Sequence, residues 1–164
     1  MSTLKVGTIQ DHANSNTAMS IDSSGRVTTP ARPSFKAKPS SNTSVAINND
    51  IVFGDVTTSG FGLHNIGGHY NTGTGIFTAP VAGVYFFQYT TYQNAQTGAE
   101  VDLFLNGTAV GVAREFGGSD MNYNSLNHAQ NLLLAASDEV KVRVVVGTAY
   151  VNINVSSFSG FLIG

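Results

Sequence analysis

Cysteine and tryptophan are absent from the 164-residue chain, and charged residues make up only 11% of it. Without cysteine the chain can form neither a disulfide framework nor a thiolate metal site. The N-terminus lacks a basic start followed by an apolar run, so we expect no signal peptide. No apolar run is long enough to cross a bilayer, so we also expect no membrane insertion.

The motifs of common catalytic sites are also missing. The chain has no G-x-S-x-G elbow, no phosphate-binding glycine loop and no H-E-x-x-H pair. The net charge is −2, and the basic residues in positions 1–38 are scattered, which argues against a nucleic-acid partner. We therefore expect a non-enzymatic protein, and an enzyme on a jelly-roll scaffold is the least favoured hypothesis.

The residues that are abundant favour strands and turns. The chain has 18 glycines and many Ser, Thr and Asn residues, and no segment has the composition of a stable helix. Short alternating runs recur about every ten residues, and Asn106-Gly107 is a strong hairpin signal. The pattern predicts an all-β, antiparallel sandwich or jelly roll of about ten strands, including strands at 51–56 and 151–163.

The segment 61–92 is central to this prediction because its last strand, 84–92, is apolar on both faces. Tyr85, Phe87 and Tyr89 point one way, whereas Val84, Phe86 and Tyr92 point the other way. A half-buried antiparallel strand alternates apolar and polar residues. We therefore expect one face to pack on the core and the other to meet a second subunit.

Residues 1–33 are predicted to form a separate N-terminal anchoring or stem segment before a domain at 34–164. Asp22-Ser-Ser-Gly25 predicts a turn between two short strands, and Pro30 and Pro33 mark the boundary. The segment has too few apolar residues to fold alone, so a sister chain or another protein should cover them. These anchoring residues are Leu4, Val6, Ile9, Ile21 and Val27.

The domain at 34–164 carries a regular spacing of an amide, aromatic residues and a glycine, and it ends in Ser-Phe-Ser-Gly-Phe-Leu. The spaced positions are Asn65, Tyr70, Phe77, Gly83, Tyr85, Phe87 and Tyr89. In this spacing and in its last strand the domain resembles the globular head of complement C1q and its tumour necrosis factor-like relatives. It departs from the family pattern at Ser59 and Ser137 and in lacking the usual cysteine in 75–80.

The resemblance implies a ten-stranded jelly roll that assembles as a trimer around a threefold axis. It implies that Gly83, Tyr85, Phe158 and Ile163 pack the protomer core, and that Phe86 meets neighbouring subunits. The alternative is that Phe86 lies under a loop of its own chain. The residues predicted for the trimer interface and core are Val84, Tyr85, Phe86, Phe87, Tyr89, Tyr92, Phe158 and Ile163.

The N-terminal segment is similar to those of virion proteins from marine and cyanobacterial phages, in its STLKV-x-TIQ start and its IDSSGRV-x-x-P piece. This resemblance implies a virion protein whose trimeric knob caps a fibre or tail, or decorates the capsid. Its expected partners are other virion proteins and a host-surface glycan or protein. The alternative is a secreted, extracellular C1q-like module that recognises patterns or carbohydrates for a bacterium or invertebrate.

No cofactor is expected. His64 and His69 could share a metal across a trimer axis, but ordinary loop positions are favoured because no carboxylate accompanies them. Calcium needs six to eight oxygens from several loops, so solvated carboxylates are the favoured interpretation of the acidic residues. The calcium candidates are Asp50, Asp55, Asp120, Asp138 and Glu139.

Two loops, 93–99 and 117–127, are the candidate ligand-binding segments, because binding residues concentrate on exposed loops. The second loop mixes aromatic and amide groups that suit sugars or protein surfaces. Plain connections are an equally good interpretation. The candidate ligand residues are Asp120, Met121, Asn122, Tyr123 and Asn124.

Overall fold

The computed structural model describes residues 4–93, 98–116 and 124–164, and in these ranges it contains antiparallel strands and no helix. The all-β prediction is therefore confirmed. The chain divides into two compact units, Met1–Arg32 and Pro33–Gly164.

The first unit is a three-stranded antiparallel sheet in the order β1-β2-β3. Its strands are β1 (Thr8–Gln10), β2 (Thr17–Ile21) and β3 (Val27–Thr28). The turn between β2 and β3 is the one that the sequence predicts. Asp22 accepts hydrogen bonds from the backbone N–H groups of Ser24 and Arg26, and Gly25 has a φ of 78°. The pairing of β1 was not predicted.

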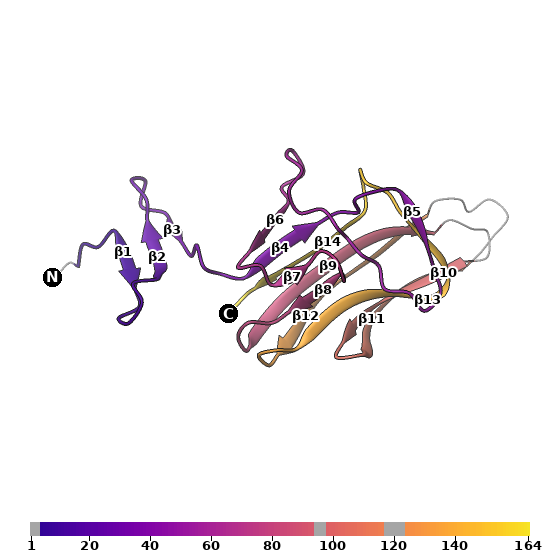
Figure 1. The fold of residues 1–164 in the computed structure, drawn as a ribbon. Helices are drawn as coiled ribbons and strands as arrows, with labels where there is room; N and C mark the ends of the chain where they lie inside the picture. Colours follow the sequence, from indigo (N-terminus) through magenta and orange to yellow (C-terminus); the bar gives the residue numbers. More distant parts are fainter. Residues whose placement is uncertain (1–3, 94–97, 117–123) are drawn as a thin grey trace. The chain divides into compact units, whose positions relative to one another are not determined.

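The second unit is a sandwich whose two layers are joined through one long strand (Figure 1). One layer runs β12-β9-β14-β4-β6, and the other contains β11-β10-β13 with β8 and β7. The strands are β4 (Ser34–Ala37), β5 (Thr43–Ala46), β6 (His64–Ile66), β7 (Tyr70–Asn71), β8 (Ile76–Thr78), β9 (Gly83–Gln93), β10 (Gly98–Leu105), β11 (Thr108–Phe116), β12 (Ser125–Leu134), β13 (Glu139–Val151) and β14 (Ser157–Leu162).

β13 changes layer at Gly147. Before this residue β13 pairs with β10, and after it with β5 and β9. Gly147 has a φ of 66°, and a Cβ at this position would lie 2.3 Å from the Gly98 carbonyl oxygen. Only glycine fits a left-handed bend this close to another backbone.

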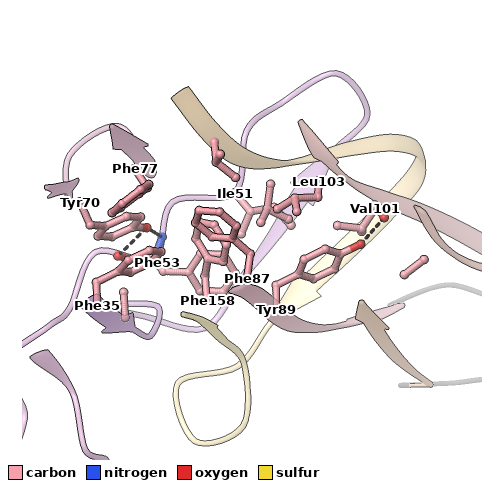
Figure 2. Close-up of a cluster of buried hydrophobic side chains, with 14 of the residues drawn as sticks. Phe35, Ile51, Phe53, Tyr70, Phe77, Phe87, Tyr89, Val101, Leu103 and Phe158 are labelled. Carbon is pink, nitrogen blue, oxygen red and sulfur yellow. Dashed lines mark hydrogen bonds between the residues drawn. The ribbon is translucent and has the colours of Figure 1, made fainter. Parts of the chain in front are cut away.

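Aromatic side chains from both layers fill the core (Figure 2). The rings of Phe35 and Tyr70 stack with 4.5 Å between their centroids, and Phe158 meets Phe35 edge-on at 4.9 Å. The Tyr70 hydroxyl donates to the Phe53 carbonyl oxygen over 3.1 Å, and burial raises the pKa of Tyr70 well above its ordinary value. The buried hydroxyl therefore has its partner.

Irregular backbone replaces one predicted strand and part of another. Residues 51–56 form no strand: Asp55 pairs with Lys38 in an isolated bridge, and the Ile51 N–H donates to the Val142 carbonyl oxygen. The backbone N–H of Phe53 instead donates to the Tyr70 hydroxyl over 3.3 Å. A side chain thus provides the hydrogen-bond partner that a neighbouring strand would otherwise provide. The predicted strand 151–163 is broken at 152–156 by a turn in which the Ser156 N–H donates to the Asn152 carbonyl oxygen.

Candidate functional site

Strand β9 divides a buried aromatic face from a partly exposed one. Tyr85, Phe87 and Tyr89 are completely buried between the layers, and Phe158 from β14 is buried with them. Val84, Phe86 and Tyr92 point to the opposite, outer face and are partly exposed. The alternation along β9 thus puts Tyr85, Phe87 and Tyr89 in the core and leaves the other three predicted residues of this strand on the outer face.

An apolar patch covers one end of this outer face, and it consists of Val84, Phe86, Leu133, Phe161 and Ile163. Leu133 lies opposite Val84, and Phe161 lies opposite Phe86 with 5.4 Å between the two ring centroids. Leu133 is 78% exposed, and Phe161 and Ile163 are each 42% exposed. An uncovered group of large apolar side chains is typical of a protein contact surface.

The placement of Ile163 corrects one expectation. The family pattern implies that Ile163 packs the protomer core, but its side chain lies on the outer face. Its N–H donates to the Val84 carbonyl oxygen, which continues the β9–β14 pairing. Since side chains alternate along a strand, Ile163 shares the side of Phe161 and not that of buried Phe158.

At the other end of the same face, Tyr92 lines a cavity of about 320 Å³, which we call the aromatic cavity. Tyr92 lies opposite Tyr150, and Asn152 and Val155 from the following turn complete the described lining. Tyr92 is eight residues from Val84, which is about 26 Å along a strand. The aromatic cavity is therefore well separated from the apolar patch.

A second cavity, of about 80 Å³, lies between β4, the loop before β6 and the turn at 153–157. We call it the lysine cavity because Lys36 and Lys38 both line it, together with Phe61 and Leu63. Lys38 is only 9% exposed, and its Nζ lies 4.4 Å from the centre of the Phe61 ring. Val155 lines both cavities.

The sequence pattern did not predict the lysine cavity. The available signal was the spacing of Lys36 and Lys38, because residues two apart in an extended segment lie on one face. The same spacing is equally typical of an exposed strand at the edge of a sheet, so it does not by itself predict a binding site. The loop and turn that enclose the lysines come from distant parts of the chain.

Three of the calcium candidates, Asp50, Asp55 and Asp138, are engaged by other groups of the chain. Asp50 accepts from Lys141 over 2.7 Å and from Arg143 over 2.5 Å, while Asp138 accepts from the Asn106 amide over 2.8 Å. Asp55 holds the turn that follows it, and hydrogen bonds from the Thr58 hydroxyl and the Thr57 N–H lower the pKa of Asp55. Asp120 lies outside the described residues.

His64 and His69, the pair considered for a shared metal, belong to no larger group of metal-ligating side chains within the described ranges. His64 Nδ1 lies 2.9 Å from the Gly62 carbonyl oxygen. Across residues 4–93, 98–116 and 124–164, no three His, Cys, Asp or Glu side chains are placed to hold a metal ion.

β10 carries two buried carboxyl groups that the sequence did not indicate as special. Glu100 pairs with Arg114 on β11 and is 5% exposed. Asp102 is 3% exposed, and its Oδ1 has no hydrogen-bond partner among the described residues. Burial, followed by the charge of Glu100, raises the pKa of Asp102 to about 6.

The candidate ligand loop falls mostly outside the described residues. This applies to Asp120, Met121, Asn122 and Tyr123, and to residues 94–97 of the other loop. Asn124 is described, and its amide donates to Glu115 over 3.4 Å.

The predicted anchoring residues are all exposed within the first unit. Leu4 is 85% exposed, Val27 is 55%, and Ile9 is 48%. Val6 and Ile21 are 37% and 40% exposed. The first unit thus leaves these five apolar side chains exposed. No helix in the described part of the chain is long and apolar enough to span a membrane.

Comparison with known families gives a match over most of the second unit. The model of the C1q domain matches residues 34–163. The chain belongs to the C1q domain family. Mouse complement C1q tumor necrosis factor-related protein 3 is 35% identical over 119 residues, which are 71% of this chain and 45% of that protein. Rat complement C1q tumor necrosis factor-related protein 5 is 37% identical over 106 residues, which are 62% of this chain and 43% of that protein.

This C1q-family chain thus spans less than half the length of the curated relatives it matches. Among solved structures, the globular domain of zebrafish complement 1qA superposes with a TM-score of 0.64 at 20% identity, over 80% of this chain and 98% of that one. The Eiger TNF of S. frugiperda gives 0.58 at 14% identity, over 81% and 92%. These likenesses confirm the C1q and tumour necrosis factor type of jelly roll.

Proposed function

We propose that this C1q-family protein is a non-enzymatic structural component of a phage particle. Its head forms a trimeric knob at a fibre tip, on a tail or on the capsid, and the N-terminal segment anchors the knob to another virion protein. The observation that carries the trimeric knob is the apolar patch on the outer face of β9, which the chain's own fold leaves partly exposed. The resemblance of the N-terminal segment to phage virion proteins supports the location.

The trimer accounts for the patch in physical terms. Burying apolar area contributes about 25 cal/mol per Å². The patch combines Phe86, Phe161 and Leu133, which are large side chains of the kind that dominate subunit contacts. A threefold axis would bring this surface from each copy against its neighbours. The family resemblance implies the same assembly.

Substitution of Phe86 by Asp tests the trimer. A carboxylate on the patch would have to be desolvated in the interface, so we expect monomers or aggregates in light scattering in place of a trimer. Ile47→Asp is the control, because Ile47 is 49% exposed and lies beyond β5, outside the patch. A native trimer from Phe86→Asp would refute the assignment of this face.

The anchoring role of the N-terminal segment is tested by protease protection. Its apolar side chains are exposed, so we expect rapid cleavage in the isolated protein and protection inside a particle. A variant carrying Ile9→Asp and Ile21→Asp should keep the head folded but fail to enter particles. A protein found secreted and soluble, with no particle, would exclude the virion role.

The second candidate is a secreted, extracellular recognition module. It is favoured by the relatives that match, since these carry complement C1q in their names. Both candidates place the head outside a cell and use it for binding. Imaging of purified particles distinguishes them, because only the virion role puts the protein on the particle surface.

A further inference from the structure

The sheet of the first unit has an apolar face that its own chain does not cover. Ile9 of β1 lies directly opposite Met19 of β2, and Ile21 of β2 lies opposite Val27 of β3. Met19 and Ile21 are two residues apart on one strand, so all four side chains share one face, which we call the stem face. Each of the four is between 38% and 55% exposed. A sheet of three short strands needs such a face to be packed against a partner.

The opposite face of this sheet is polar. Ser20 of β2 lies opposite Thr8 on one side and opposite Thr28 on the other. Within β1, β2 and β3, all of which the structure describes, no residue is charged. The sheet is therefore amphipathic, and the partner of the stem face should be an apolar surface without charge. A second copy of the stem face is such a surface.

The size of the stem face favours other copies of the chain over an unrelated protein. A stable contact between two separate proteins takes about 20–30 residues from each of them. The stem face offers four side chains. A contact this small is stable only inside an assembly that is already held together elsewhere, where forming it costs little entropy.

The trimer proposed for the head is such an assembly, and the chain ties the first unit to its contact surface. β3 ends at Thr28 and β4 begins at Ser34, so the linker consists of residues 29–33 alone. Ser34 lies opposite Phe161 of the apolar patch. A linker of this length spans at most about 20 Å. A trimer of heads therefore holds three first units at an effective concentration on the order of millimolar.

We propose that the stem faces of three copies pack against one another around the threefold axis and form a trimeric stem. This inference rests on the trimer proposed for the head and names the surface that the N-terminal segment uses. The four apolar side chains form the core of the stem, and the hydroxyl-bearing face is left to the solvent. Leu4 and Val6 precede β1, so they stay available for contact with another virion protein. Arg32 in the linker is exposed, so a protease can still cut the isolated trimer there.

Disulfide trapping in the full chain tests the stem, because the protein has no cysteine of its own. Met19→Cys places a thiol on the stem face, and the matched control Ser20→Cys places one on the polar face of the same strand. A disulfide needs two Cβ atoms about 4 Å apart, so only stem faces in contact can form one when the trimer is mildly oxidised at low protein concentration. At most two of the three chains in a trimer can link. We therefore expect up to about two thirds of Met19→Cys chains as dimers on a non-reducing gel, at least about fivefold more than for Ser20→Cys.

Ile9→Cys and its control Thr8→Cys repeat the comparison on β1, in case a substitution in β2 disturbs the sheet. The proposal is overturned if the cysteines on the stem face do not link, or if those on the polar face link equally well. It is also overturned if the cysteines on the stem face link to a different protein when particles are oxidised. Light scattering on the same samples separates the stem from the head: a trimer with unlinked stem faces refutes the stem alone, whereas a monomeric chain refutes the trimer and the stem together.

Discussion

Gly160 shows how tightly single residues are constrained in the aromatic core. A Cβ at this position would lie 2.6 Å from the Phe87 ring and 2.9 Å from the Phe35 ring. We predict that Gly160→Ala lowers the free energy of unfolding by about 1–3 kcal/mol, because the rings must shift to admit a methyl group. Urea unfolding measures the effect. Ser159→Ala, the neighbouring residue on the outer face, is the control and should change stability little.

Asp102 makes a pH-dependent contribution to stability. Its pKa in the folded protein is raised from 3.8 to about 6, so the folded state holds a proton that the unfolded chain releases. Stability therefore falls as pH rises from about 4 through 6. We predict that Asp102→Asn is more stable than the parent by up to about 2–3 kcal/mol at pH 7.5, and that the gain shrinks at pH 4.

Unfolding in urea at both pH values measures this difference. Asp138→Asn provides a control of opposite sign, because hydrogen bonds from Asn106 and Ala135 lower the pKa of Asp138. That contribution is present at neutral pH and is lost on acidification. An Asp102→Asn variant that is less stable than the parent at pH 7.5 would contradict the effect of burial.

At the scale of elements, the β10–β11 hairpin depends on Asn106. Asn106 and Gly107 both have positive φ, at 49° and 83°, as a tight two-residue turn requires. The Asn106 side chain also accepts from the Glu139 N–H over 2.9 Å and donates to Asp138, which ties the hairpin to the start of β13. We predict that Asn106→Ala costs about 1–3 kcal/mol of stability.

Thermal unfolding followed by circular dichroism checks this prediction. Asn106→Gly is the informative comparison. It restores the backbone freedom but not the hydrogen bonds, so it should recover part of the loss. Equal stability of the parent, Asn106→Ala and Asn106→Gly would show that neither the side chain of Asn106 nor its backbone conformation contributes to the free energy of unfolding.

At the scale of the whole molecule, the two units are predicted to be thermodynamically separable. The second unit contains the continuous buried core, whereas the first exposes its apolar residues. We predict that a chain of residues 33–164 unfolds within about 1 kcal/mol of the parent and assembles to the same size. Denaturation and light scattering test this. A truncated chain that fails to assemble would assign the trimer contacts to the N-terminal segment.

The sequence by itself determined the features that depend on neighbouring residues. Turn residues such as Asp22, Gly25 and Asn106-Gly107 give correct bends because their preferences act within a few residues. The parity of 84–92 likewise separates the buried face from the outer face, since side-chain alternation is a local property of strands. The class of fold follows from repeating these local patterns.

Tertiary structure decided everything that depends on which distant segments meet. The segment 51–56 looks like a strand, but the Tyr70 hydroxyl meets the backbone of Phe53 in place of a regular ladder partner. Lys36 and Lys38 become a cavity only where the loop before β6 and the turn at 153–157 close over β4. Asp102 is buried only through the packing around β10. Local patterns carry no information on these contacts, because each joins residues far apart in the chain.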